Sequence, residues 1–142
     1  MSKTVTHTVH VEFGDCDPAS IVWFPNFFRW IDAASRHFFI ECGVPHWGET
    51  EKTLGVIGTP IVDTHAKFVK TASYGDALEF HVSIPEWRGK SFVQRYVCKR
   101  GDDVIMECDE VRIFAGRRED GGIRALPIPE SIRRLCEQVK PA

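Results

Sequence analysis

The sequence predicts an α+β fold in which one long helix packs against an antiparallel β-sheet. Residues 25–42 are strong helix-forming material without an internal break. Residues 62–68 and 78–84 alternate between apolar and polar side chains, which is the period of a strand with one buried face, and residues 91–99 and 104–115 are further strand candidates. The links between these strands are short, and short links join antiparallel strands. We therefore expect a curved antiparallel sheet around one central helix, followed by a short C-terminal helix.

The N-terminal segment predicts a strand that leads into the long helix. Residues 5–13 alternate, with Val5, Val9, Val11 and Phe13 on the side expected to be buried. Pro25 suits the first helical position, where its missing N–H costs nothing. A glycine at position 43 and a proline at position 45 then stop the helix. Because its apolar residues lie on more than one face, we expect this helix to be largely enclosed.

The rest of the chain predicts further strands and a short helix. Residues 46–60 indicate a loop or a weak helix, because glycine and proline interrupt them. Strands are expected at 62–68, 78–84, 91–99, 104–115 and briefly at 123–126. Pro129 opens the short helix, whose apolar stripe consists of Ile132, Leu135, Cys136 and Val139. No repeat or boundary interrupts the chain, so we expect residues 1–142 to form one domain.

Composition and simple motifs argue against several classes of protein. The net charge is −2 with well-mixed charges, so neither nucleic acid nor a membrane is an expected partner. Five cysteines without a C-x-x-C pair favour reduced thiols in a cytoplasmic protein. No apolar run resembles a signal peptide or a membrane span. The histidines lack the spacing of metal ligands, and we expect no metal site. Serine-hydrolase and nucleotide-binding motifs are also lacking.

The segment from Phe13 to Pro18 places two carboxylates directly before an apolar stretch. Asp15 and Asp17 would share a side of an extended chain, and burial would raise the pKa of one of them. Asp17 is the better catalytic candidate, because Pro18 restricts its backbone. Cys16 lies between two carboxylates that disfavour a reactive thiolate, so we interpret it as a packing residue. A plain turn is the alternative, since these residues also form turns.

The start of the long helix adds a second chemical feature. If Pro25 is the first helical residue, Phe24 caps the helix without offering a side-chain acceptor to the first-turn amides. Such amides favour developing negative charge, including a carbonyl oxygen that becomes an oxyanion. Asp17 could attack that carbonyl or deprotonate a water molecule that attacks it. Both routes stay open, as do Ser20 and Asn26 as alternative capping residues.

Two groups of charged residues each allow two interpretations. Arg88 and Lys90 form a small basic cluster at a junction between strands, which indicates either phosphate recognition or a solvated hairpin tip. Arg29, Asp32 and Arg36 have helical spacing, which is typical of a ladder of ion pairs. On an enclosed helix the same stripe would line a pocket.

Several segments together resemble a known family. The segments are Val11–Ala19, Ile21–Asn26, Arg29–Arg36, Gly58–Val62, Thr71–Tyr74 and Glu86–Arg95. In them the chain resembles the 4-hydroxybenzoyl-CoA thioesterases of the hot-dog fold. The resemblance implies hydrolysis of an acyl-CoA thioester without a metal or organic cofactor. It also implies that Asp17 is the catalytic carboxylate and that the Phe24 backbone N–H polarises the thioester carbonyl.

The resemblance further implies how the substrate binds. Arg88, Lys90 and Ser91 match positions that bind the nucleotide and phosphates of CoA. Asp32 and Thr59 match positions that line the acyl pocket, and Asp32 fits a hydroxylated aromatic acyl group. Members of the family assemble as homotetramers from hot-dog dimers, with their sites at subunit interfaces.

Two positions depart from the family pattern. Ser20 stands where glycine is usual, and Gly89 interrupts a longer basic run. We expect a cytoplasmic acyl-CoA thioesterase that acts on an aromatic substrate such as 4-hydroxybenzoyl-CoA. The alternatives are a thioesterase for short-chain aliphatic acyl-CoA, a hot-dog hydratase and a non-catalytic acyl-CoA-binding protein.

Overall fold

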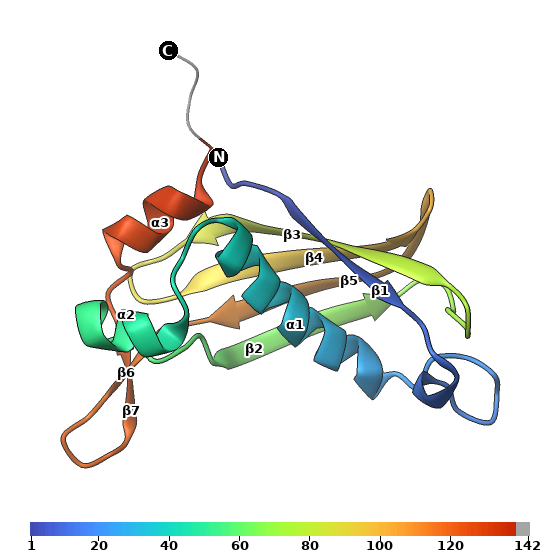
Figure 1. Cartoon of the computed structure of the whole chain (residues 1–142), viewed down its shortest axis with the longest axis horizontal. Coiled ribbons are helices and arrows are strands. Elements are labelled where there is room, and N and C mark those ends of the chain that lie inside the picture. Colours follow the sequence, from blue (N-terminus) through green and yellow to red (C-terminus); the bar gives the residue numbers. More distant parts are fainter. Residues whose placement is uncertain (139–142) are drawn as a thin grey trace.

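A long helix, α1, lies across one face of a five-stranded antiparallel sheet (Figure 1). The computed structural model describes residues 1–138. The strand order is β1-β3-β4-β5-β2, and β6 pairs with β7 in a separate two-stranded sheet. The elements are β1 (Val5–His10), the 3-10 helix η1 (Phe13–Asp15), α1 (Pro25–Glu41), α2 (Trp47–Leu54), β2 (Ile61–Phe68), β3 (Ala77–Trp87), β4 (Phe92–Arg100), β5 (Asp103–Arg112), β6 (Phe114–Arg117), β7 (Ile123–Leu126) and α3 (Glu130–Cys136).

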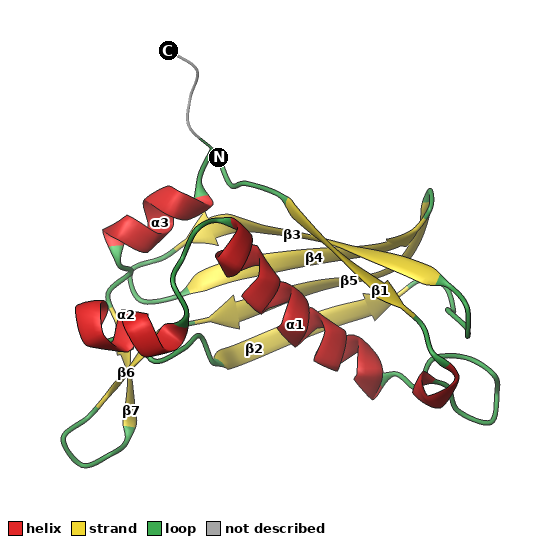
Figure 2. Cartoon of the chain, in the orientation of Figure 1, coloured by secondary structure: helices red, strands yellow, loops and turns green. Residues whose placement is uncertain are grey.

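The predicted α+β class is confirmed, including the long helix, the antiparallel sheet and the short C-terminal helix (Figure 2). The long helix begins at Pro25 as predicted, and β7 covers the predicted residues 123–126. The segment predicted as a loop or weak helix contains the eight-residue α2. The strand predicted at 104–115 instead divides into β5 and β6, which belong to different sheets. Between them, the Ile113 N–H donates to the Pro60 carbonyl.

One face of α1 is buried and the other is exposed. Phe27, Ile31, Ala34 and Phe38 are buried at helical spacing and pack with the inward-facing side chains of the sheet. Ile40 is 51% exposed, so the expectation of a largely enclosed helix is wrong. The sheet covers only one side of α1, and this leaves the opposite side of the helix available for further contacts.

The first strand ends earlier than predicted, and this changes the position of Phe13. Val5 and Val9 are half-buried and Val11 is buried, as the alternation predicts. After His10 the chain turns into η1, so Phe13 leaves the plane of the sheet and is 81% exposed. Phe13 therefore contributes to the surface at the end of the molecule rather than to the core.

The elements at the two ends of the sheet differ. α2, α3 and the β6–β7 hairpin gather at one end, and η1 with its loop lies at the other (Figure 1). Ile132 and Cys136 of α3 are buried and Leu135 is 38% exposed, whereas Val139 lies outside the described residues. Within residues 1–138, no helix is long and apolar enough to cross a membrane.

Candidate active site

The loop before α1 is a short hairpin that is tied to the start of the helix. The Asp17 N–H donates to the Ile21 carbonyl at 2.9 Å, and Cys16 forms a β-bridge with Val22. The Asp15 carbonyl accepts from the Trp23 N–H at 2.9 Å and from the Asn26 side-chain amide at 2.8 Å. The backbone of this loop is therefore fixed relative to the first turn of α1.

Asp17 lies half-buried on this hairpin and faces an open groove of about 570 Å³. The groove is lined mainly by apolar surface, and its other lining residues are Phe13, Gly14, Cys16, Pro18, Ser20 and Tyr74. Asp17 Oδ1 accepts a hydrogen bond from the Ala19 N–H at 2.8 Å. In the described part of the chain, Oδ2 accepts none, which leaves this oxygen available to a substrate or a water molecule.

Asp15 has a structural role that separates it from Asp17. Its Oδ2 accepts a hydrogen bond from the Glu12 N–H at 2.8 Å and caps η1. Because η1 interrupts the extended chain, the two carboxylates bind the backbones of two different turns. The prediction that Asp15 and Asp17 share one side of an extended segment is therefore wrong. Cys16 is half-buried and packs against the core, with its Sγ 3.9 Å from the Glu12 carbonyl oxygen.

The start of α1 lacks a side-chain cap, as predicted. Phe24 is the N-cap residue, and no side chain caps the helix. The Asn26 and Phe27 N–H groups donate to the Trp23 and Phe24 carbonyls, so these two amides are not available to a ligand. Pro25 has no N–H. Among the described residues, the Phe24 N–H has no acceptor, and it is the donor that this helix start leaves open.

Neither alternative capping residue caps the helix. Asn26 lies inside α1, and its side chain binds the loop. Ser20 forms the hairpin turn with a φ of +66°, in the left-handed region that favours glycine. Ser20 is thus a residue with a side chain at a position that suits glycine, in agreement with the departure seen in the sequence.

A second cavity lies beside the middle of α1 and brings together Asp32 and Thr59. Its volume is about 350 Å³, and its other lining residues are Ser35, Arg36, Trp47, Gly58 and Arg112. Arg112 Nη1 donates to the Thr59 carbonyl at 2.8 Å, and Nη2 donates to Asp32 Oδ1 at 3.3 Å. The two residues assigned to the acyl pocket by resemblance therefore share a cavity and one cationic partner.

The sequence interpretation missed Arg112 and its partner Glu110. Both side chains are buried and lie 2.9 Å apart (Nη2 to Oε1). Burial lowers the pKa of Arg112, but the charge of the Glu110 carboxylate and its hydrogen bond to the guanidinium act in the opposite direction, so the pKa is raised and the guanidinium stays charged. A signal for this pair exists, since both residues continue the period-2 pattern of the buried Met106 and Cys108.

The ladder of ion pairs predicted along α1 does not form. Among residues 1–138, Asp32 pairs with Arg112 and not with Arg29 or Arg36. Arg29 contacts Asn26 at 3.4 Å, and the Arg36 guanidinium lies 4.8 Å from the centre of a Trp47 ring. The pocket interpretation of this polar stripe is the one that the structure supports for Asp32.

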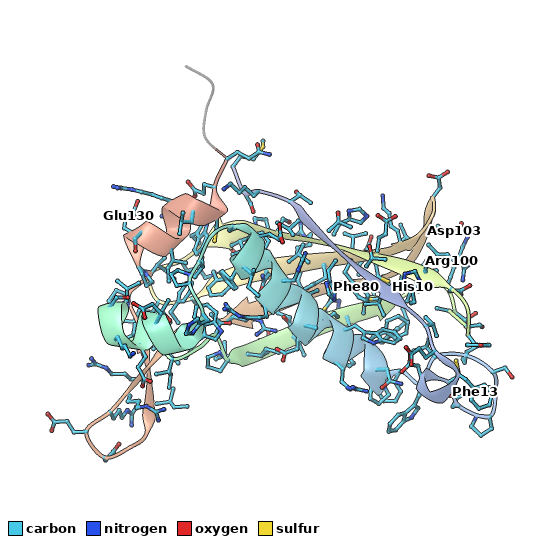
Figure 3. All side chains as sticks on the ribbon, in the orientation of Figure 1. His10, Phe13, Phe80, Arg100, Asp103 and Glu130 are labelled. Carbon is cyan, nitrogen blue, oxygen red and sulfur yellow. The ribbon has the colours of Figure 1, made fainter. Side chains whose placement is uncertain are left out.

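The basic cluster lies far from Asp17 within one chain. Arg88, Lys90 and Ser91 form the turn between β3 and β4, where the Gly89 carbonyl accepts from the Ile128 N–H just before α3. Figure 3 shows Glu130 of α3 and Phe13 of the Asp17 groove at opposite ends of the molecule. The 11 residues of β3 separate the two ends by ten steps, which is about 33 Å at ~3.3 Å per step.

The chain is similar in sequence to known proteins over nearly its full length. Residues 11–135 match the model of the thioesterase-like superfamily. The chain is 51% identical over 142 residues to the 4-hydroxybenzoyl-CoA thioesterase of Pseudomonas sp. (strain CBS-3). That match covers 96% of this chain and 99% of the relative.

Solved structures agree with the sequence match. The structure of 4-hydroxybenzoyl CoA thioesterase from Pseudomonas sp. strain CBS-3 has a TM-score of 0.88 and 47% identity, and covers 95% of this chain and 100% of that chain. A gentisyl-coenzyme A thioesterase has a TM-score of 0.78 and 31% identity, covering 91% and 99%. The expected hot-dog fold is confirmed. The chain belongs to the thioesterase-like superfamily and, within it, to the 4-hydroxybenzoyl-CoA thioesterase family.

Proposed function

We propose that the protein is a thioesterase that hydrolyses an aromatic acyl-CoA, such as 4-hydroxybenzoyl-CoA, to the free acid and CoA. The observation that carries this proposal is the hairpin that fixes Asp17 beside the uncapped start of α1. A carboxylate and an open backbone donor are the two groups that the hydrolysis of a thioester requires here. The relative from Pseudomonas sp., named for this activity, supports the same assignment.

Asp17 and the Phe24 N–H have separate parts in the reaction. In one route an Asp17 oxygen bonds to the thioester carbon, the C–S bond breaks, and water then cleaves the resulting anhydride. In the other route Asp17 accepts a proton from a water molecule, whose oxygen bonds to the same carbon. In both routes the carbonyl oxygen gains negative charge and accepts a hydrogen bond from the Phe24 N–H, while CoA leaves as a thiol or thiolate.

The nucleotide end of CoA binds the β3–β4 turn. Arg88 can form forked hydrogen bonds with a phosphate, Lys90 adds a point charge, and Ser91 adds a hydroxyl donor. Arg88 and Lys90 are exposed, and Arg88 is paired only with the equally exposed Glu86 at 3.0 Å among described residues. A pair of this kind is weak in water and is easily exchanged for a phosphate.

The distance between the two ends of the sheet supports a site that is shared between copies of the chain. The segment that leads to Asp17 lies at the start of β3 and the β3–β4 turn at its end, so one copy would supply the carboxylate and another the basic turn. The edge strand β2 supports such an assembly. Among residues 1–138 no strand pairs with its outer side, and four apolar residues in β2 or directly after it are 44–58% exposed: Ile61, Val62, Phe68 and Val69. We assign β2 to a dimer contact within a homotetramer.

The acyl group occupies the cavity beside Asp32 and Thr59. The Asp32 carboxylate accepts a hydrogen bond from a ring hydroxyl, which favours a hydroxylated aromatic acyl group over an aliphatic one. We also place the activity in the cytoplasm, because all five cysteines are free thiols and four of them are buried.

Hydrolysis of a panel of acyl-CoA substrates tests the proposal. Release of free CoA thiol is followed with 4-hydroxybenzoyl-CoA, benzoyl-CoA and a short-chain aliphatic acyl-CoA. We expect hydrolysis of the aromatic substrates, with the hydroxylated one preferred. A preference for the aliphatic substrate would contradict the aromatic assignment. Tight binding of every substrate without thiol release would instead identify an acyl-CoA-binding protein.

A further inference from the structure

Arg112 connects the two residues of the acyl cavity to the interior of the protein. Its Nε donates to Glu110 Oε1 at 2.9 Å, its Nη1 donates to the Thr59 carbonyl at 2.8 Å, and its Nη2 donates to Asp32 Oδ1 at 3.3 Å. The three nitrogen atoms of this guanidinium thus donate to acceptors in three different segments of the chain. A planar cation with several fixed donors is suited to this arrangement.

We propose that Arg112 is a positioning residue that sets acyl specificity through Asp32, an inference that rests on the proposed function. The Asp32 side chain is 74% exposed, and Arg112 is the partner that the described residues provide for its carboxylate. The contact fixes Oδ1. Within residues 1–138, Oδ2 accepts no hydrogen bond, and Asp32 lines the cavity, so this oxygen is available as an acceptor for a ring hydroxyl.

Buried polar side chains lie around Arg112, since its partner Glu110 stands opposite the buried Gln94 in the register of β4 and β5. Glu110 holds the guanidinium from the core side. On the neighbouring strand, the Tyr96 hydroxyl and the Ser35 hydroxyl of α1 both donate to Gln94 Oε1, at 2.9 and 2.7 Å. Burial raises the pKa of Tyr96 well above its usual value, so this hydroxyl stays protonated and keeps its donor. Sheet and helix are therefore locked together where the cavity forms.

An Arg112→Lys variant tests the inference through the ratio of two substrates. Lysine keeps the charge but cannot bind Glu110, the Thr59 carbonyl and Asp32 at once. We expect the ratio of kcat/KM for 4-hydroxybenzoyl-CoA to that for benzoyl-CoA to fall by about tenfold or more, which is the scale of one hydrogen bond to a charged group. Arg95→Lys, on the surface of the same sheet, is the matched control and should leave the ratio unchanged.

A double-mutant cycle separates positioning from a general structural effect. In an Asp32→Ala background, Arg112→Lys should change the ratio by less than about twofold, because the group through which it acts is absent. If Arg112→Lys does not fold, the Glu110→Leu/Arg112→Met variant removes both buried charges together and is expected to fold. It should show the same loss of discrimination.

The outcomes distinguish this inference from the proposed function. One outcome is that the wild type hydrolyses both substrates while Arg112→Lys leaves the ratio of their kcat/KM values within twofold of the wild type. This result would overturn the role of Arg112 and leave the proposed function intact. So would an equal loss of kcat/KM for the two substrates. A wild-type protein without activity on any acyl-CoA overturns the proposed function and, with it, this inference.

Discussion

The first turn of α1 and the cavity two turns further along the same helix are built in different ways. At the first turn, Asp17 and the Phe24 N–H are positioned by backbone hydrogen bonds within the short segment 15–26. Beside the middle of the helix, Asp32 is positioned by Arg112, which lies 80 residues away in the sequence. One site depends on local backbone geometry and the other on a buried pair of charges.

Because of this difference, we expect substitutions at the two places to have separate effects on the reaction and on the stability of the fold. The loop at the first turn is half-exposed and contributes little buried surface, so a change at Asp17 should affect the reaction and leave the fold intact. The Glu110–Arg112 pair lies in the core, where a charge without its partner is costly. A change there should weaken the fold as well as the cavity.

Glu110→Gln should lower the free energy of unfolding by about 3 kcal/mol, because it removes the buried carboxylate partner of Arg112 and leaves that charge only the exposed Asp32 carboxylate. Urea unfolding followed by circular dichroism measures this. Asp109→Asn is the matched control, since its pair with Arg95 is about half exposed on each side and should cost less than about 1 kcal/mol. Equal losses for the two variants would show that burial does not distinguish the pairs.

Asp17→Asn should reduce kcat for 4-hydroxybenzoyl-CoA by at least about 100-fold, since the amide is neither a nucleophile nor a base. Its free energy of unfolding should stay within about 0.5 kcal/mol of the wild type, because Asp17 lies outside the core and asparagine keeps the Oδ1 that accepts from the Ala19 N–H. Thiol release and urea unfolding measure the two effects. Asp102→Asn, in the turn between β4 and β5, is the control with normal rate and stability. Turnover within threefold of the wild type would remove Asp17 from the reaction.

Arg88→Ala/Lys90→Ala should raise KM for acyl-CoA by about tenfold with little change in kcat, because these charges bind a part of the substrate that does not react. If the site is shared between copies, this variant and Asp17→Asn complement each other when they are refolded as an equimolar mixture. The mixture should be more active than the sum of the two variants refolded separately. Activity equal to that sum would place each site within one chain.

Ser20→Gly should raise the free energy of unfolding by up to about 1 kcal/mol, because glycine adopts the positive φ of this hairpin without the strain of a side chain. Ser20→Ala keeps the strain and should show no gain. Thermal unfolding of the two variants measures the difference. Identical unfolding temperatures would show that the loop relaxes around Ser20 and that the start of α1 is less rigid than its hydrogen bonds indicate.

The sequence predicted local features well, because their causes lie within a few residues. Pro25 as the first residue of α1 and Phe24 as a cap without an acceptor follow from the chemistry of adjacent residues. The prediction for Phe13 was wrong because η1 replaced the end of the strand, a competition between turn and strand that alternation does not decide. For the same reason, Asp15 and Asp17 were wrongly predicted to lie on one side of an extended chain.

The charged residues of the middle site were harder to interpret from the sequence. Asp32 was paired with its helical neighbours Arg29 and Arg36, which is the usual contact on an isolated helix. In the structure Asp32 instead pairs with Arg112, a buried residue of β5. Glu110 and Arg112 were overlooked because charged residues are generally exposed, although their alternation with buried neighbours indicated the core face.

The amino-acid sequence alone was enough to predict most of the order of strands and helices, the uncapped start of α1 and the motif that identifies the family, although α2 was expected only as a loop or a weak helix and the division between β5 and β6 was not predicted. Each of these depends on residue types at short spacing. The three-dimensional structure was needed to show which partner Asp32 takes, how Thr59 reaches the same cavity, and that the β3–β4 turn lies far from Asp17. The physical reason is that these relations depend on strand register and on the packing of α1 against the sheet, which combine contributions from the whole chain.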